Sequence, residues 1–161
     1  MCGIVGYVGK REATPLLIEG LRRLEYRGYD SAGVCIQANG ALHVRKQVGR
    51  VEGLAQSLKA KPVKVSLGIS HTRWATHGLP SDINSHPHLD QSGKIAMVHN
   101  GIIENYAALR HRLQRHGHRF LSQTDTEVLA HLIGYHLDKA LARNGEVTPE
   151  RVTQAIFAAT R

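Results

Sequence analysis

Residues 2–9 read CGIVGYVG, a short run of branched and aromatic side chains bounded by glycines. Runs of this kind predict a buried strand. Because the strand would begin almost at the first residue, we expect the N-terminus to be tied into a sheet. The same stretch carries chemistry, since removal of Met1 would leave a thiol and a free α-amine together on Cys2.

Strand and helix patterns alternate along the rest of the chain. A Thr-Pro pair at 14–15 opens a predicted helix, which Gly28 can close in the left-handed conformation. Asn39 and Gly40 separate VCIQA (34–38) from ALHVRKQ (41–47), which predicts a hairpin. The remaining patterns predict a helix at 51–58, strands at 65–71 and 95–100, and a loop at 75–94. Three more helices are predicted: one at 103–117, one that begins at a capping box at 124–127, and one that begins at 148. The fold class is therefore mixed α and β, and periodicity alone does not determine the topology.

The composition limits the classes of protein to which the chain can belong. With 161 residues and 42% hydrophobic content, the chain can form one compact domain without disulfides or a structural metal. Two cysteines and the lack of a leader pattern favour a cytoplasmic, reducing location, and no run of about 20 apolar residues predicts a membrane anchor. The net charge of +8 is concentrated at 109–119, where leucines at helical spacing favour a solvated helix face. With only 5% aromatic residues to stack on bases, we expect no nucleic-acid partner.

Cys2 is a candidate nucleophile because its own α-amine would be an adjacent base. An α-amine titrates near ~7.7 to 8.0, much closer to neutral pH than a lysine near ~10.4, so it can accept the thiol proton. The resulting thiolate attacks far better than the thiol. Position alone favours a simpler alternative, in which Cys2 is a small apolar residue at the edge of the first strand.

Six motifs favour the nucleophile over the apolar strand residue. They are CGIVGYVG (2–9), LRRLEYRGYDSAG (21–33), HTRWATHG (71–78), NSHPH (84–88), VHNGIIENY (98–106) and SQTDTEV (122–128). In this order they resemble the glutaminase domain of the glucosamine-6-phosphate synthase family, class II glutamine amidotransferases with an N-terminal-nucleophile hydrolase fold. The resemblance spans nearly the whole chain, 1–161. It implies an α+β fold with sheets sandwiched between helices, in which the C-terminal part of the sandwich is missing from these residues.

The resemblance also implies which residues react. Cys2 would be the nucleophile and its α-amine the base. The side-chain amide of Asn100 and the backbone N–H of Gly101 would form the oxyanion hole, as neutral donors aimed at a developing negative charge. Without the resemblance, an Asn-Gly pair after a strand is more simply an ordinary turn.

Recognition of glutamine is implied at four further positions. Arg73 would bind the α-carboxylate with its planar fork, and Asp125 would bind the α-ammonium. Thr76 and His77 would complete the pocket. The residues alone leave two alternatives open, a surface ion pair for Arg73 and a helix N-terminal role for Asp125.

Trp74, Arg27 and four histidines are the remaining candidate site residues. By resemblance, Trp74 faces the route along which ammonia leaves, although core packing is nearly as good an explanation. Arg27 would shape the pocket floor. Histidines at 71, 77, 86 and 88 raise the question of zinc, but Pro87 and the absence of paired cysteines fit no common zinc site, so we expect no metal and no other cofactor.

These observations predict hydrolysis of L-glutamine to glutamate and ammonia through a thioester on Cys2. In a full-length enzyme the ammonia would aminate fructose 6-phosphate at a sugar-isomerase domain that these residues do not contain, and the full-length protein would form a homodimer. The alternative is a catalytically silent remnant or a regulatory module that binds glutamine.

Overall fold

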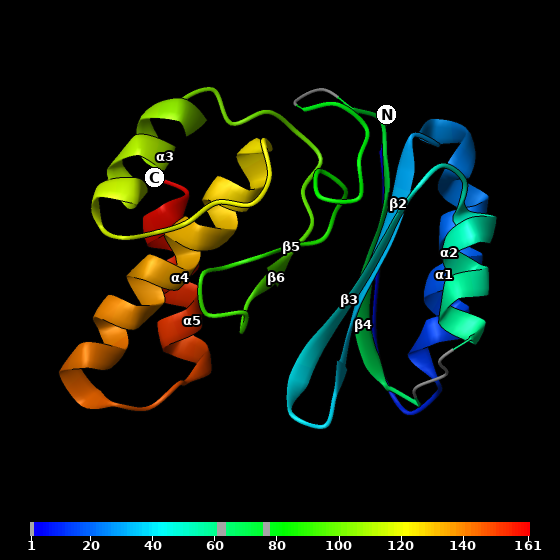
Figure 1. Ribbon diagram of the computed structural model, residues 1–161. Coiled ribbons are helices and arrows are strands. Elements are labelled where there is room, and N and C mark those ends of the chain that lie inside the picture. The colour runs from blue at the N-terminus through cyan, green and yellow to red at the C-terminus, as the bar shows by residue number, and fades with distance from the viewer. Residues whose placement is uncertain (1, 61–63, 76–77) are drawn as a thin grey trace.

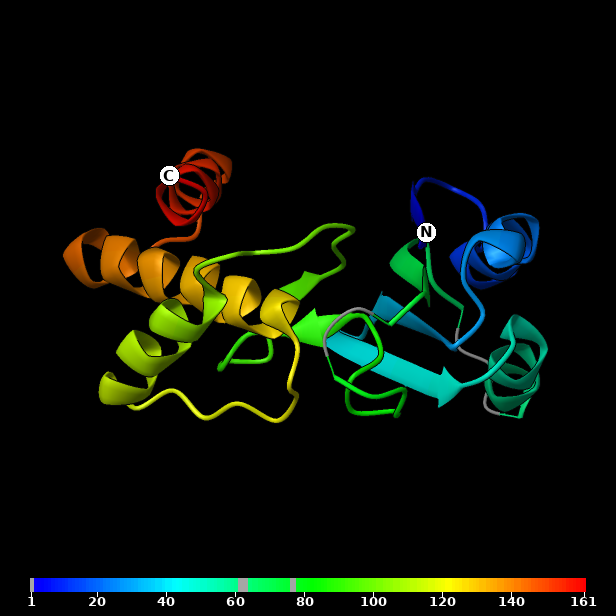
Figure 2. The same cartoon turned by 90° about the horizontal axis from the view of Figure 1, so that it is seen from above.

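The fold places β structure between two groups of helices. We describe a computed structural model of the chain, which covers residues 2–60, 64–75 and 78–161. Helices α1 (Ala13–Leu24) and α2 (Val51–Lys59) lie on one side, and α3 (Tyr106–Arg115), α4 (Asp125–Asn144) and α5 (Pro149–Ala159) lie on the other (Figure 1). Seen from above, the two groups of helices are at opposite ends of the molecule, with the strands between them (Figure 2). The predicted α+β class, with sheets between helices, is confirmed.

The larger sheet has four antiparallel strands in the order β1-β4-β2-β3. Their bounds are Gly3–Val8 for β1, Ser31–Ala38 for β2, Ala41–Val48 for β3 and Leu67–Arg73 for β4. The hairpin prediction is confirmed, because Asn39 and Gly40 both take positive φ, 51° and 75°, between β2 and β3. Gly3 pairs with Thr72, and Ser31 pairs with Arg73. The start of β1, the start of β2 and the end of β4 therefore lie side by side at one end of the sheet.

Two apolar clusters hold the layers together. Helices α1 and α2 bury one face against the sheet, and this cluster includes Leu17, Leu21, Val34, Val51 and Leu54. A second cluster joins α3 to α4. It is centred on Leu113, Val128 and Leu132. Amphipathic helices therefore cover both outer sides of the β structure, as their 3.6-residue apolar spacing requires.

The smaller sheet is shorter than the sequence predicts. Strand β6 (Ala96–Met97) pairs only with β5 (His88–Leu89), so the strand predicted at 95–100 is wrong beyond its first residues. Because β5 offers two residues for pairing, residues 98–100 leave the sheet and turn toward the end of β4. The predicted loop at 75–94 correspondingly contains β5 near its end.

Gly28 corrects a second prediction. Helix α1 passes into a single 3-10 turn, η1 (Glu25–Arg27), and Gly28 then has φ −174° and ψ 128°, so it is extended and not left-handed. A Cβ atom at this position would lie 2.9 Å from the carbonyl carbon of Arg73. Glycine is needed here for close backbone approach to the end of β4, and not for a helix cap.

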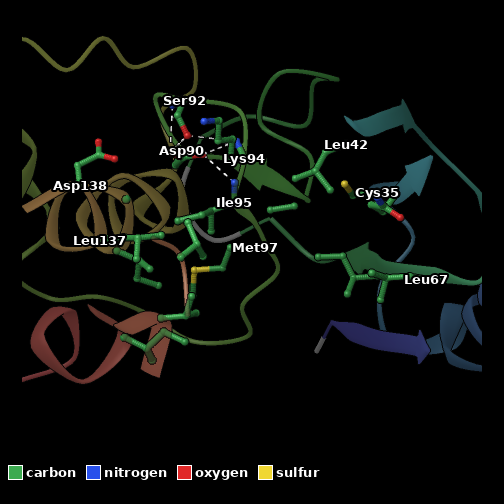
Figure 3. A pocket seen from close by; sticks show the side chains of 18 of the residues that line it. Cys35, Leu42, Leu67, Asp90, Ser92, Lys94, Ile95, Met97, Leu137 and Asp138 are labelled. Carbon is green, nitrogen blue, oxygen red and sulfur yellow. Dashed lines mark hydrogen bonds between the residues drawn. The ribbon is translucent and has the colours of Figure 1, made fainter. Parts of the chain in front are cut away.

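An apolar cavity of about 630 Å³ lies between the sheet and helices α4 and α5 (Figure 3). Leu42 and Leu67 line it on the sheet side, and Leu137 lines it on the helix side. The carboxylate of Asp90 at its rim accepts hydrogen bonds from Ser92 Oγ at 2.6 Å and from the backbone of Lys94 at 2.9 Å, so this charge is held within its own turn. Among the residues that the structure describes, no helix is long and apolar enough to cross a membrane.

Candidate active site

Cys2 lies where β1 meets the end of β4. The backbone N–H of Gly3 donates to Thr72 Oγ1 at 3.1 Å, which ties the strand start to β4. The backbone N–H of Trp74 then donates to Cys2 Sγ at 3.1 Å, and the thiol lies 3.6 Å from the Trp74 carbonyl oxygen. Cys2 is a partly exposed free thiol. An N–H aimed at sulfur stabilises a thiolate, so this geometry suits a nucleophile better than an apolar strand residue.

Asn100 and Gly101 follow β6 and reach the same place from the other side. The side-chain Nδ2 of Asn100 donates to the carbonyl oxygen of Cys2 at 3.1 Å, and its Oδ1 lies 2.8 Å from His71 Nε2. Gly101 has φ 159°, a value that favours glycine, and a Cβ atom there would also lie 2.8 Å from His99 Nε2. The Asn-Gly pair thus lies beside Cys2 in the folded chain.

Arg73 and Asp125 are both buried beside Cys2. Arg73 is the last residue of β4 and is 4% exposed, so the surface ion pair considered from the sequence is wrong. It donates to the carbonyl oxygen of Gly78 at 3.1 Å. Burial lowers the pKa of the Arg73 guanidinium, while electrostatic interaction with Cys2, Asp30 and Asp125 raises it, which places these groups in one electrostatic cluster.

Asp125 opens helix α4, and its Oδ2 accepts the backbone N–H of Ile103 at 2.9 Å. The carboxylate thus fastens the chain just after Gly101 to the start of α4. Only one of its oxygens is used in this bond, and a carboxylate can accept at both.

These residues line one cavity of about 470 Å³. Its lining is Cys2, Arg27, His71, Arg73, Trp74, His86, His99, Asn100, Gly101, Ile102, Thr124, Asp125 and Thr126. A partly exposed thiol, the Asn100 amide, a buried guanidinium and a buried carboxylate therefore line a volume suited to a small polar molecule.

Arg27 and Trp74 also line this cavity. Trp74 is 48% exposed and meets Tyr29 edge-on, with ring centroids 5.8 Å apart, so the core-packing alternative for this residue is wrong. Arg27 comes from η1 and lines the cavity. Thr76 and His77 lie outside the residues that the structure describes, and their predicted roles are untested.

Three buried histidines form a cluster at the cavity, which His71 and His86 line. His71 and His86 stack with ring centroids 4.2 Å apart, and His86 meets His88 edge-on at 4.8 Å. Burial lowers the pKa of His71 to about 4 and lowers the pKa of His86 and His88 much further, with the charge of Lys46 adding to the effect on both. All three rings are neutral at pH 7. Within the described ranges, no group of three or more His, Cys, Asp or Glu side chains is arranged to hold a metal ion.

The family follows from comparison with known sequences. The family model described as "Glutamine amidotransferase domain" matches residues 55–145, which is more than half of the chain. The chain belongs to the glutamine amidotransferase domain family.

Relatives of this amidotransferase domain are much longer proteins. It is 59% identical over 133 residues to the glutamine–fructose-6-phosphate aminotransferase (isomerizing) of Thermus thermophilus, a match that covers 83% of this chain and 22% of that protein. It is 52% identical to the protein of the same name from Corynebacterium diphtheriae, over 96% of this chain and 27% of that protein. The chain thus spans about a quarter of the length of these curated relatives.

Solved structures give the same result for the fold. The amidotransferase domain superposes on glutamine phosphoribosylpyrophosphate amidotransferase from B. subtilis with a TM-score of 0.76 and 29% identity, over 99% of this chain and 32% of that one. A structure titled as the allosteric regulatory enzyme of purine biosynthesis matches with a TM-score of 0.76 and 30% identity. The fold is therefore of the N-terminal-nucleophile hydrolase type, as the motifs predicted.

Several residues of the amidotransferase domain that lie at or beside this cavity were not assigned to it from the sequence, among them Asp30 and His71. Asp30 accepts the backbone N–H of Ala75 at 2.8 Å and donates its own N–H to the Arg73 carbonyl at 3.1 Å, so it holds the segment that contacts Cys2. His71 was considered only as a zinc ligand. Its position two residues before Arg73 on a strand was the available signal, because alternate residues of a strand share a face.

Proposed function

We propose that this chain, residues 1–161, is a glutaminase domain that hydrolyses L-glutamine to glutamate and ammonia. The observation that supports it best is the 470 Å³ cavity, in which Cys2, Asn100, Gly101, Arg73 and Asp125 converge from separate parts of the sequence. Its polar groups match the three ends of glutamine. Arg73 is suited to the α-carboxylate, Asp125 to the α-ammonium, and the Cys2 thiol with its two neighbouring donors to the side-chain amide.

The proposed reaction begins once Met1 is removed and the α-amine of Cys2 is free. The amine takes the thiol proton, and the thiolate forms a bond to the side-chain amide carbon. The second N–H of Asn100 and the backbone N–H of Gly101 stabilise the negative oxygen, and removal of one such donor typically costs about 10² to 10³ in rate. The ammonium returns its proton to the leaving nitrogen, the carbon–nitrogen bond breaks, and ammonia departs.

Hydrolysis of the glutamyl thioester completes the cycle. The free α-amine accepts a proton from water, hydroxide adds to the thioester carbon, and the carbon–sulfur bond breaks to give glutamate and the thiol. The backbone N–H of Trp74, 3.1 Å from Cys2 Sγ, stabilises the sulfur as a leaving group. No cofactor takes part in this scheme.

The wider setting is carried over from the relatives. We infer that the ammonia serves amination of fructose 6-phosphate by a sugar-isomerase domain, as the names of the relatives indicate. Trp74 at the cavity edge is suited to face the route of ammonia, with Arg27 at the pocket floor and Thr76 and His77 completing glutamine binding. A cytoplasmic location and a homodimeric full-length protein belong to the same proposal.

Glutamate release by variants of the two cysteines tests the function. Cys2→Ala, or a variant that retains Met1, should lower release to background, because either change removes the thiol or caps the amine. Cys35→Ala is the matched control and should release glutamate at the unaltered rate, since Cys35 is 2% exposed in β2 and burial raises its pKa to about 11. Unchanged release by Cys2→Ala would refute the mechanism. Calorimetric binding of glutamine without any release by the unaltered chain would instead support the regulatory module.

A further inference from the structure

We infer that His71 is a positioning residue for the glutaminase reaction: as an Nε2–H donor it holds the Asn100 amide with its NH₂ group toward Cys2 and the cavity. The inference rests on the proposed function, and it assigns a role to a residue that does not itself need to touch glutamine. Its starting point is the pair of hydrogen bonds made by the Asn100 amide.

The two ends of that amide have different partners. Nδ2 lies 3.1 Å from the Cys2 carbonyl oxygen, and Oδ1 lies 2.8 Å from His71 Nε2. A carbonyl oxygen only accepts hydrogen bonds, so the NH₂ end must be the one that faces Cys2. Oδ1 also only accepts, so the proton of His71 must be on Nε2.

The surroundings of His71 restrict the orientation of its ring. It is 1% exposed in the middle of the sheet, on β4, and its ring stacks on His86 with an interplanar angle of 16°. Among the described residues, Nδ1 of His71 has no hydrogen-bond partner. The buried ring therefore makes its short side-chain hydrogen bond with Asn100, and the backbone of His99 also raises its pKa. Buried polar groups keep the orientation that satisfies their hydrogen bonds, so both neighbours hold the ring in place.

Without this donor the amide could rotate. A rotated amide would place Oδ1 toward the cavity, where it would repel the negative oxygen that Asn100 is proposed to stabilise. Removing the His71 donor should therefore lower kcat as much as removing the Asn100 side chain does, by about 10² to 10³. Glutamine binding by Arg73 and Asp125 should be unaffected.

A double-mutant cycle tests this coupling. His71→Leu removes the donor, and Asn100→Ala removes the group that it orients. Each should lower kcat for glutamate release by about 10²-fold with KM within about twofold, and the double variant should be no more than about threefold slower than Asn100→Ala. His71→Gln places an amide N–H at similar reach and should recover most of kcat.

Two results would overturn the inference. One is a double variant whose loss is the product of the two single losses, because the residues would then act independently. The other is a folded His71→Gln protein as slow as His71→Leu. If the unaltered chain released no glutamate at all, the proposed function would fail and the cycle could not be measured, so the orientation needs a readout without turnover.

Nitrogen-15 NMR of the unaltered chain supplies that readout. Long-range proton–nitrogen correlations should report His71 as the neutral Nε2–H tautomer at pH 7 and still neutral at pH 5. Asn100→Ala should shift the His71 Nε2 resonance, whereas Cys35→Ala should leave it in place. The Nδ1–H tautomer would overturn the inference whether or not the chain is active.

Discussion

At the scale of single residues, burial decides the charge of His71, His86 and His88. The three rings form one cluster at the proposed glutamine cavity, and each is less than a tenth exposed. Burial penalises the charged form of each ring, so the folded chain binds fewer protons than the unfolded chain at mildly acidic pH. The cluster therefore links stability to pH.

The sign of that link follows from the lowered pKa values. The cluster's contribution is fully present above pH 6.5, where folded and unfolded rings are both neutral. As the pH falls below 6.5 the unfolded rings become charged first, and stability is lost. For His71 the loss ends near pH 4, the pKa to which burial lowers it. Each ring contributes up to about 1.4 kcal/mol per pH unit.

Urea unfolding between pH 7 and pH 5 measures this effect. The free energy of unfolding should fall over this range. For His88→Gln the slope of that free energy against pH should be shallower, because about one proton fewer is taken up on unfolding. Glutamine can keep the hydrogen bond that His88 Nε2 makes with Thr124 Oγ1 at 3.0 Å. An equal slope for the variant and the unaltered chain would contradict the assignment of His88 as a buried neutral ring.

At the scale of elements, the start of helix α4 connects stability to the site. Thr124 caps the helix, its side chain accepting from the Glu127 N–H, and the next residue, Asp125, faces the cavity. The carboxylate of Glu127 accepts from the backbone N–H groups of Leu121 and Ser122 at 2.8 Å and 2.7 Å. The capping box predicted at 124–127 is confirmed in position, but its glutamate binds the preceding turn.

Two threonine caps allow a matched comparison. Thr124 and Thr148 each accept a backbone N–H at 3.4 Å, but only Thr124 is buried and also bonded to Ser122 and His88. Thr148→Ala should cost about 1 kcal/mol of unfolding free energy. Thr124→Ala should cost about 2 to 4 kcal/mol, because it also leaves buried polar groups without a partner. Chemical denaturation checks both, and equal costs would contradict the role given to burial.

At the scale of the whole molecule, the sheet and helices α4 and α5 leave an apolar cavity of about 630 Å³ between them (Figure 3). Apolar surface that is not packed against protein binds hydrophobic dyes. We expect the native chain to enhance the fluorescence of anilinonaphthalene sulfonate.

Neighbouring residues on α5 provide the control for this prediction. Ile156 lines the cavity and Phe157 does not, although they are 43% and 59% exposed. Ile156→Gln should lower dye binding, and Phe157→Gln should leave it nearly unchanged. Equal effects of the two changes would show that the dye binds elsewhere on the surface.

Local patterns in the sequence were sufficient for much of this fold. The hairpin at Asn39 and Gly40, the first strand and the capped helices after 124 and 148 depend on neighbouring residues, and the structure has them where they were predicted. The motifs also identified Cys2, Arg73, Asn100, Gly101 and Asp125, which the cavity brings together, but gave no role to other lining residues such as His71, His99 and Thr126. Strand 95–100 was overpredicted because a strand needs a partner, and the pairing length of β5 is not visible in the sequence of β6.

Residue type and short spacing were enough to predict most of the elements, the family and the candidate nucleophile. The tertiary structure was needed to show that the ends of β1 and β4, the turn at Asn100 and the start of α4 meet around one cavity. It also decided that Gly28 serves close approach and that Cys2 is accessible while Cys35 is not. Burial and contact between distant segments depend on how layers pack, and no local pattern encodes that packing.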